Sequence, residues 1–558
     1  MTNLVVPATV DGEILVCSEG LSFWGGVDAA TGTVIDAHHP QCGKSLTGKI
    51  VLMPTSRGSC TGSGVLLELA MNGRAPAALI FREHEDILTL GALIATNMFN
   101  HPVAVVHLSP DEYDRLTAKI EAKINGHELI SEGICINLNP VKATDLVLSD
   151  ADRDMLAGKN GNAAKLAMET LCTMAAAQNA RSLTDVTRAH IDGCIYASPA
   201  NLVFAKAMVE MGAKVRIPTT MNAISVDHAN WRSQNVPLDF GLPASQLADS
   251  YVQMGARPSF TCAPYLLEEP PGVDEEVGWS ESNAVIFANS VLGARTAKHP
   301  DFLDLFIAIT GRAPLSGVYC GENRIAQIVI NVETPENFDD AIWPLLGWIS
   351  GQMAPDRIPL LKGLENTTPS QDDLKALCAA FGTTSAAPML HVAGITPESN
   401  RPPVDGAAHK SLTREDLARA WTDLNTGGTK IELVALGSPH FSLDETRLFA
   451  GLMNDRKCHE DTSVIVTLGR DVCKAAKEAG LVSRLQDAGV KVITDLCWCS
   501  ISEPVFPPGT GNLMTNSGKY AHYAPGLCGS TVRFGSLEQC ADAAQTGYAP
   551  DELPDWLK

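Results

Sequence analysis

The chain has 558 residues, which is too long for one ordinary domain, so two to four domains are expected. Hydrophobic residues make up 45% and charged residues 19% of the chain, an ordinary globular composition that argues against extensive disorder. The net charge of -22 disfavours a nucleic-acid partner, because phosphate backbones are bound by clustered Lys and Arg. A compact anionic ligand stays compatible with this charge, since a local pocket can be cationic.

The first residues, MTNLVVPATVDGEILV, show no basic segment followed by an apolar one, and no run of about 18 apolar residues follows. We therefore expect a cytoplasmic protein with no membrane partner. Fifteen Cys residues in such a chain are expected to be reduced thiols, most of them in the core and a few of them ligands.

Short apolar runs alternate with glycine turns over the first 135 or so residues. Between the second and third runs, GSCTGSGVLLELAMNG is typical of a turn that enters a helix, which puts Ser59 between a strand end and a helix start. This is where α/β proteins place their chemistry. The strands are expected at Glu13–Val16, Lys49–Met53, Ala77–Phe81 and Val103–His107.

The segment ISEGICINLNPVKAT, from Ile130 to Thr144, has the composition of a connector, and Ser149 then offers an N-cap for a helix. We therefore expect one domain over residues 1–138 and a second over 139–558. One helical face is then marked by apolar side chains, and alternating helical and strand-like segments continue to the end, as in an α/β domain. The residues of that face are Ala163, Ala167, Leu171 and Met174.

The serine loop is the first candidate for chemistry. Ser59 has Arg57 close by, several backbone amides, and a following helix whose dipole favours negative charge, so the loop suits an alkoxide or a bound anion. A plain glycine turn, or a phosphate cradle with no catalytic role, fits the same residues. Ser63 is a second hydroxyl in the loop, so the base could be either serine.

Four cysteines in turn-like contexts form the second candidate, because thiolates suit soft metals and iron–sulfur clusters. No CxxC spacing occurs near them, and each also fits the role of a small buried hydrophobe. They are Cys262 in FTCAPYL, Cys320 in VYCGENR, and Cys497 and Cys499 in TDLCWCS.

The third candidate is the polar run LMTNSGKYAHYAPG, which holds Lys519, Tyr520 and His522 within four residues. Such a set can bind a carboxylate and transfer protons. A surface loop near the end of the chain is the alternative interpretation.

Taken together, these segments resemble the aconitase X family, a branch of the aconitase superfamily, over nearly the whole chain. GGVDAATGTVID and HPQCGKSLTGKIVLMPTSRGSCTGSG look like the family's swivel domain, which some members carry as a separate small subunit. The larger part matches through AHIDG, PTTMNAISVD, FTCAPYL, WSESNAVIFANSVLGART, GRAPLSGVYCGENR, HVAGITPE, GSPH, TDLC and MTNSGKYAHY. The resemblance implies a small β/α swivel domain followed by a large multi-lobed α/β/α catalytic region.

The resemblance also implies roles for individual residues. Ser59 would be the general base of the swivel domain, and Cys262 and Cys497 would hold an iron–sulfur cluster. Ser438 stands in GSPH where related sequences carry GCPH, which implies an altered cluster or another third ligand. A two-iron cluster is favoured over three- or four-iron types. Cys320 is the favoured substitute ligand and Cys499 the reserve.

The implied reaction is a dehydration. Cluster iron would accept the leaving hydroxyl as a Lewis acid, and a serine alkoxide, stabilised by Arg57 and the helix-start amides, would remove a proton beside a carboxylate. The residues expected to hold the substrate's carboxylate or amine are Thr219, Thr220 and Asn222 in PTTMN together with Lys519, with Ser63, Tyr520 and His522 as further contacts.

The fused swivel domain and the changed cluster position resemble the bacterial branch of the family, which implies cis-3-hydroxy-L-proline as substrate and Δ1-pyrroline-2-carboxylate as product. Mevalonate 5-phosphate dehydration, the activity of the split archaeal branch, is the alternative. An iron-sensing or RNA-binding regulator is an alternative of another class, which the acidic charge disfavours. Citrate isomerisation is disfavoured because the paired-cysteine motif of true aconitases is not found. We expect a small-molecule substrate and a monomer or small homo-oligomer.

Overall fold

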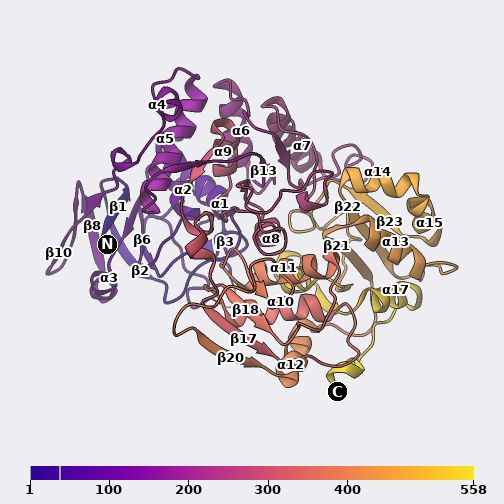
Figure 1. Cartoon of the computed structure of the whole chain (residues 1–558). Helices are drawn as coiled ribbons and strands as arrows, with labels where there is room; N and C mark the ends of the chain where they lie inside the picture. Colours follow the sequence, from indigo (N-terminus) through magenta and orange to yellow (C-terminus); the bar gives the residue numbers. More distant parts are fainter. Residues whose placement is uncertain (1, 37–38) are drawn as a thin grey trace.

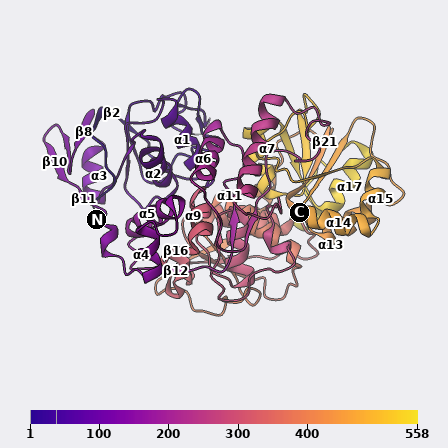
Figure 2. The ribbon, with the colours of Figure 1, turned by 90° about the horizontal axis from the view of Figure 1, so that it is seen from above.

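The computed structural model describes residues 2–36 and 39–558. The N-terminal part lies at one side of the molecule and the last sheet, coloured orange to yellow, at the other (Figure 1). Seen from above, the middle of the chain lies between these two parts (Figure 2). In the described part of the chain, no helix is both long enough and apolar enough to span a bilayer.

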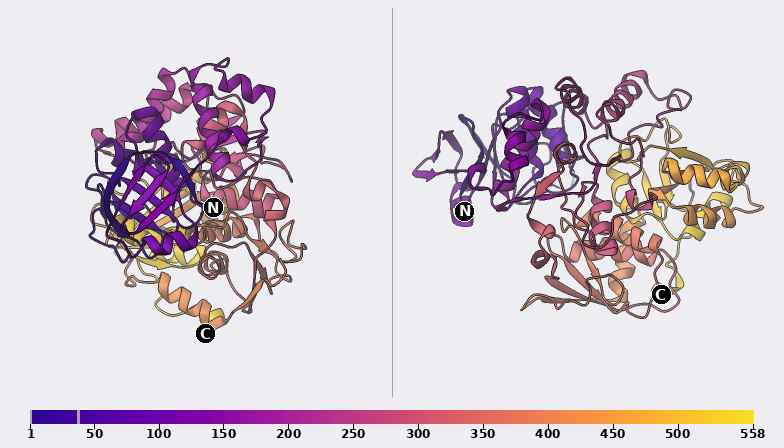
Figure 3. Two further views of the ribbon diagram at one scale, coloured as in Figure 1. Left: turned by 90° about the vertical axis from the view of Figure 1, so that its left-hand side faces the viewer. Right: turned by 45° about the horizontal axis from the view of Figure 1, so that its top comes forward.

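A nine-stranded mixed sheet forms the N-terminal part, which faces the viewer in the left panel of Figure 3. Its central strands are parallel and read as continuous apolar runs, as expected for strands covered on both faces. From edge to edge the strands are β10 (Ile134–Asn137), β9 (Glu128–Ser131), β8 (Glu121–Asn125), β2 (Val10–Val16), β5 (Ile50–Met53), β6 (Ala78–Phe81), β7 (Ala104–His107), β1 (Asn3–Val6) and β11 (Asn139–Pro140).

Three helices accompany this sheet, and the first two pack against each other: α1 (Gly62–Met71), α2 (Ile87–Phe99) and α3 (Pro110–Leu116). A small hairpin of β3 (Val27–Asp28) and β4 (Thr33–Val34) lies between β2 and β5 in the sequence. The four predicted strands are confirmed as β2, β5, β6 and β7.

The connector predicted over Ile130 to Thr144 is wrong, because much of this segment forms strands. β9 ends within it, β10 lies inside it, and β11 pairs with β1. The physical reason is visible in the burial of β10, where Ile134 and Ile136 point inward and Cys135 and Asn137 point outward. The predicted domain boundary falls one residue before β11, so the chain is still hydrogen-bonded to the N-terminal sheet at that point.

The next part is rich in helices and contains a short parallel sheet. Ser149 caps its first helix by accepting a hydrogen bond from the Asp152 amide at 3.1 Å, as predicted. The predicted helical face is confirmed, since its four residues are buried on one helix. The helices are α4 (Asp150–Leu156), α5 (Asn162–Ala177), α6 (Pro199–Glu210), α7 (Leu238–Gln253), α8 (Ser282–Phe287) and α9 (Leu303–Thr310).

The short sheet of this part carries much of the site described below. Its three strands are parallel, in the order β14 (Thr219–Met221), β13 (Ala189–Ile191) and β15 (Gly278–Trp279). A separate antiparallel pair joins β12 (Leu183–Asp185) to β16 (Arg312–Pro314).

A four-stranded parallel sheet follows, at the bottom of Figure 1. Its order is β19 (His391–Val392), β18 (Pro359–Lys362), β17 (Ile328–Val332) and β20 (Ala408–Leu412). The accompanying helices are α10 (Ile342–Met353), α11 (Gln371–Thr384) and α12 (Arg414–Leu424), of which α10 and α11 pack closely together.

The last part is a five-stranded parallel sheet in the order β23 (Lys491–Thr494), β22 (Ser463–Leu468), β21 (Leu433–Phe441), β24 (Asn512–Thr515) and β25 (Thr531–Phe534). Its helices are α13 (Leu443–Leu452), α14 (Arg470–Glu478), α15 (Leu481–Ala488), α16 (Gly518–Cys528) and α17 (Leu537–Thr546). Helix α16 also packs against α10 and α11, and so joins this part to the preceding one. The predicted α/β architecture, a small N-terminal β/α region before a larger multi-sheet region, is confirmed.

Candidate active site

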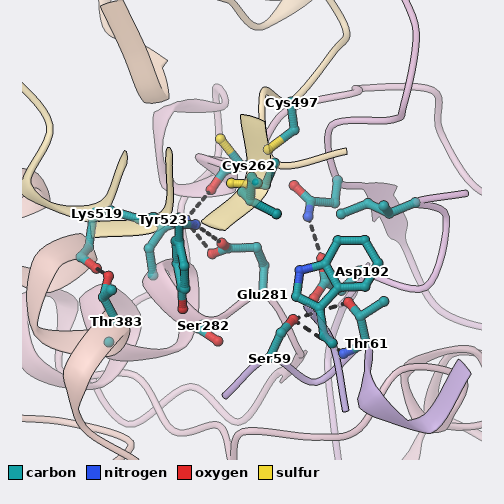
Figure 4. Close-up of a pocket in the computed structure, with 18 residues that line it drawn as sticks. Ser59, Thr61, Asp192, Cys262, Glu281, Ser282, Thr383, Cys497, Lys519 and Tyr523 are labelled. Atoms are coloured by element: carbon teal, nitrogen blue, oxygen red, sulfur yellow. Dashed lines mark hydrogen bonds and ion pairs between the residues drawn. The ribbon is translucent and has the colours of Figure 1, made fainter. Parts of the chain in front are cut away.

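A pocket lies where all four parts of the chain meet, with about 710 Å³ of space not filled by atoms, its open mouth included. Trp24, Ser59 and Thr61 come from the N-terminal part. The other polar walls come from the short parallel sheet, from α8 and α11, from the loop after β23 and from α16 (Figure 4). Residues far apart in the sequence therefore share one cavity.

The ends of the short parallel sheet supply three polar lining residues. Asp192 follows β13 directly, Asn222 follows β14, and Glu281 follows β15 by two positions. Because the carboxyl ends of parallel strands lie at one edge of a sheet, these side chains converge, as in other open α/β sheets. The Asn222 amide donates a hydrogen bond to the Asp192 carboxylate.

Ser59 lies in the turn before α1 and faces the pocket. Its Oγ lies 3.1 Å from the Thr61 Oγ1, and it also accepts a hydrogen bond from the Thr61 amide at 3.3 Å. Gly58 permits this turn, since its φ of +90° suits glycine and a Cβ there would lie 2.3 Å from the Ser22 Oγ. The loop packs tightly enough to fix the direction of the hydroxyl.

Lys519 and Glu281 form a buried ion pair in the pocket, with 2.9 Å between Nζ and Oε1. Burial alone would raise the pKa of Glu281, but the Lys519 ammonium and hydrogen bonds from α8 hold it below its ordinary value. Burial would lower the pKa of Lys519, yet the Glu281 carboxylate and the neighbouring sulfur atoms raise it well above its ordinary value. Both groups are therefore charged at neutral pH.

Three cysteines line the pocket: Cys262, Cys497 and Cys499. Cys262 and Cys497 lie on the side opposite Ser59 (Figure 4). A hydrogen bond with Cys499, acting against burial, lowers the pKa of the Cys497 thiol to about 7. The Cys497 amide donates to the Ile224 carbonyl at 3.0 Å, which ties this loop to the strand β14 region. The Cys262 Sγ accepts a hydrogen bond from the His440 amide at 3.3 Å.

His440 is a buried support for these loops. Its Nε2 lies 3.0 Å from the Leu496 carbonyl and its Nδ1 lies 3.3 Å from the Thr261 Oγ1. Burial lowers the pKa of His440 to about 4, so the ring is neutral. A neutral ring can bridge the two cysteine-bearing loops without adding charge.

Within residues 2–36 and 39–558, no three His, Cys, Asp or Glu side chains are already arranged to hold a single metal ion. The donor chemistry of the three cysteines still fits an iron–sulfur cluster, because all three residues line the same cavity and such clusters are held by thiolates.

The structure brings together six of the residues singled out in the sequence. They are Ser59, Asn222, Cys262, Cys497, Cys499 and Lys519.

Arg57 and Ser63 lie outside the pocket lining. The Arg57 guanidinium turns toward the surface and pairs with Glu19 at 2.9 Å and Asp36 at 3.3 Å. Ser63 is fully buried in α1, and its Oγ donates to the carbonyls of Cys60 and Asp301. Ser59 is therefore the loop serine that faces the cavity.

The other predicted substrate contacts also lie outside the lining. Thr219 donates to the Ile217 carbonyl, and Thr220 lies 2.8 Å from the His190 Nδ1. Tyr520 is buried against Phe506, and His522 accepts a hydrogen bond from the Trp348 indole at 3.2 Å.

Cys320 and Ser438 do not lie with the three cysteines either. Cys320 is in a turn beside Arg295, Glu276 and Glu322. Ser438 lines a separate small pocket, where its carbonyl accepts a hydrogen bond from Ser517.

Besides Ser282, Asn283 and Thr383, sequence reasoning missed four further polar lining residues, Thr61, Asp192, Glu281 and Tyr523. All four stand inside motifs already noted: GSCTGSG, AHIDG, WSESNAV and GKYAHY. A polar residue directly after a strand was the available signal for Asp192, but β13 has only three residues and is hard to recognise.

Four family models match the chain in order: the aconitase X swivel domain over residues 2–132, the first domain over 145–322, the second over 326–422 and the third over 431–546. The chain belongs to the aconitase X family. It is accordingly an enzyme of the dehydratase, or hydro-lyase, class.

Two relatives match this chain over essentially its full length. The chain is 46% identical to cis-3-hydroxy-L-proline dehydratase of Pseudomonas aeruginosa, with 100% of this chain and 99% of that protein covered. It is 44% identical to the protein of the same name from Hypocrea jecorina, covering 99% and 96%. Its fold is similar to the holo-form of Thermococcus kodakaraensis aconitase X, with a TM-score of 0.65 and 29% identity, covering 73% of this chain and all of that one.

Proposed function

We propose that this chain removes water from cis-3-hydroxy-L-proline, giving an enamine that tautomerises to Δ1-pyrroline-2-carboxylate. The observation that carries the proposal is a pocket lined by three cysteines, in which Ser59 lies opposite Cys262 and Cys497 with the Lys519–Glu281 pair between them. The full-length relatives that carry this activity in their names support the same substrate.

The charges of the pocket suit an amino acid. Lys519 is the cation among the lining residues, and Asp192 and Glu281 are the carboxyl groups. A prolyl substrate brings one carboxylate and one ammonium, so Lys519 can bind the carboxylate while a lining carboxylate binds the ammonium. Each substrate charge thus meets an opposite charge.

Ser59 is the proposed base. A dehydration removes the proton from the carbon that bears the carboxylate, and Lys519 bound to that carboxylate would favour the negative charge that develops there. The Thr61 amide donates to the Ser59 Oγ and would favour its alkoxide form. Arg57 was expected to stabilise that alkoxide, but its ion pairs point elsewhere, so the nearer amide takes this role in the proposal.

Cys262, Cys497 and Cys499 would hold the iron–sulfur cluster in this proposal. A bound cluster with an open coordination position supplies a Lewis acid for the leaving hydroxyl. Cys499 replaces Cys320 as the third ligand, because it lines the same pocket as the other two cysteines and Cys320 does not. A two-iron cluster is retained as the proposed type.

Mevalonate 5-phosphate is the alternative substrate. It carries a carboxylate and a phosphate worth close to two negative charges at neutral pH. A pocket lined by one cation and two carboxyl groups does not favour that total charge. The same balance of charges favours a zwitterion.

A direct comparison of the two substrates tests the proposal. The anaerobically purified protein should form pyrroline product from cis-3-hydroxy-L-proline and should leave mevalonate 5-phosphate unchanged. Turnover of the phosphate alone would overturn the substrate assignment while leaving the dehydratase class intact.

A further inference from the structure

The serine loop is held against one segment of the larger region. The Asp301 amide donates to the Cys60 carbonyl at 3.4 Å, and the Ser63 Oγ donates to the Asp301 carbonyl at 3.2 Å. The Cys60 thiol also contacts the Ser280 carbonyl at 3.5 Å. These contacts hold Thr61, which is only 3% exposed, beside Asp301.

Three carboxyl groups are buried behind the loop, and they differ in their partners. The Asp304 carboxylate accepts hydrogen bonds from the amides of Asp192 and Gly193, at 2.7 and 3.1 Å. Asp301 is fully buried, and neither of its oxygens receives a well-formed hydrogen bond from the described residues. An ionised Asp301 without hydrogen bonds would be costly to bury, so its carboxyl group is expected to carry a proton or to share one with a neighbour.

Asp192 is the neighbour with which Asp301 can share a proton. Burial, and then the nearby Asp192 and Asp304 carboxyl groups, raise the pKa of Asp301 well above its ordinary value, while Thr61 acts in the opposite direction. Burial, followed by Glu281 and Asp304, raises the pKa of Asp192 to about 7. The other titratable groups that face these carboxyls are Cys60, Cys194, Tyr251 and Lys519, and Lys298 lies beyond them near Cys60.

The backbone beside Asp301 is held in an uncommon conformation. Phe302 has a φ of +79°, which a bulky side chain rarely adopts. Gly193 lies close by, and a Cβ there would come within 3.6 Å of the Asp301 Cβ. Strain of this kind persists where surrounding contacts require it, and it is concentrated at functional sites.

We propose that Thr61, Asp301 and Asp192 form a proton relay that deprotonates Ser59, resting on the proposed function of Ser59 as the base. The Ser59 hydroxyl lies 3.1 Å from the Thr61 hydroxyl. Cys60, next to Thr61, accepts a hydrogen bond from the Asp301 amide, and Gly193, next to Asp192, lies against the Asp301 side chain, so the three residues are neighbours. In the proposed relay, the Thr61 hydroxyl and the Asp192 carboxyl group approach the unpartnered Asp301 oxygens to hydrogen-bond distance. Asp192 lines the pocket, so the relay ends where water can reach it.

The proton balance is complete. As the substrate C–H bond breaks, its proton goes to the Ser59 Oγ, and its electron pair forms the double bond as the C–O bond breaks. The Ser59 proton passes to the Thr61 Oγ, the Thr61 proton to one Asp301 oxygen, and the proton on the other Asp301 oxygen to the Asp192 carboxylate. Asp192 then protonates the released hydroxide, directly or through water, and the relay returns to its starting state. Thr61 and Asp301 are thus positioning residues that act through Ser59.

Hydroxyl removal at Thr61 tests the relay. Thr61→Val keeps the shape of the side chain, and kcat for cis-3-hydroxy-L-proline should fall by about 100-fold with KM and melting temperature little changed. Thr61→Ser restores a hydroxyl and should recover most of the rate. Wild-type kcat should fall below about pH 7 as Asp192 becomes protonated, and Asp301→Asn should lose both rate and this pH dependence. A Thr61→Val enzyme with wild-type kcat would overturn the relay.

A second measurement needs no substrate. An infrared difference spectrum between the wild type and Asp301→Asn at neutral pH should contain the carbonyl band of a protonated carboxylic acid from the wild type. A spectrum without that band overturns the relay, whatever the activity. A wild type that shows the band but does not dehydrate cis-3-hydroxy-L-proline overturns the proposed function instead, so the two failures are distinguishable.

Discussion

At the scale of single residues, the two serines of the loop are expected to respond differently to substitution by Ala. Ser59→Ala should lower kcat by about 100-fold or more with the iron content unchanged, because it removes the proposed base. Ser63→Ala is the matched comparison: it removes a buried hydroxyl whose proton is shared between the Cys60 and Asp301 carbonyls, so it should cost ~1 kcal/mol of stability. Because this contact supports the loop but does not react, kcat should fall far less than in Ser59→Ala. Steady-state kinetics and iron analysis of both variants check this. Loss of turnover in Ser63→Ala but not in Ser59→Ala would show that Ser63, and not Ser59, is the base.

The Lys519–Glu281 pair leads to a second prediction at this scale. Lys519→Met removes the partner of the substrate carboxylate and leaves Glu281 unpaired, so KM should rise at least about tenfold, or ~1.4 kcal/mol. Lys298→Met removes the same charge from a lysine that lies near Cys60 but does not line the pocket, and KM should stay near the wild-type value. Equal effects of the two changes would show a general charge effect instead of a specific contact.

The site could be predicted from the sequence where a residue type and its chemistry are distinctive. Ser59, Lys519 and the paired cysteines of TDLCWCS are of this kind, and all of them line the pocket. Thr219 and Thr220 could not be separated from Asn222 in the same way, because the two threonines lie within the three-residue strand β14 and only Asn222 follows its carboxyl end, and so short a strand is not recognisable in the sequence. The direction of Arg57 depends on Glu19 and Asp36, which no local pattern connects to it.

At the scale of elements, the turn before α1 is held by Gly58. Gly58→Ala would place a methyl group against Ser22 in addition to the cost of its positive φ, so it should displace the loop and lower kcat with the iron content unchanged. Gly43→Ala is the matched control, because Gly43 has a φ of +80° and open space around its Cβ position. Kinetics and melting temperatures separate the two costs. A Gly58→Ala enzyme as active as Gly43→Ala would show that the loop is not held tightly.

The helices and strands could be predicted where their apolar pattern extends over enough residues to be recognised. The apolar runs of β5, β6 and β7 identify buried parallel strands, and the cap at Ser149 identifies α4. The two- and three-residue strands β13, β14 and β15 are too short to show a period, although their ends supply Asp192, Asn222 and Glu281. The Pro, Asn and Gly content of residues 130–144 outweighed the alternation that in fact forms β10.

At the scale of the whole molecule, the N-terminal part completes the pocket by supplying Trp24, Ser59 and Thr61. The contacts that hold it include the Glu68 carboxylate, which accepts a hydrogen bond from the Ala200 amide at the start of α6 at 2.8 Å. The sequence order of the parts could be predicted from the family resemblance. Their mutual placement depends on contacts between residues more than a hundred positions apart, such as Cys60 with Ser280, which no sequence period reveals.

In the proposed function, a serine of the N-terminal part faces a cluster held by cysteines of the larger region and dehydrates a hydroxyproline. The most direct measurement is to purify the protein without air, record its visible spectrum and iron content, and add cis-3-hydroxy-L-proline. We expect a coloured, iron-containing protein that forms Δ1-pyrroline-2-carboxylate. A colourless, iron-free protein with full activity would contradict it.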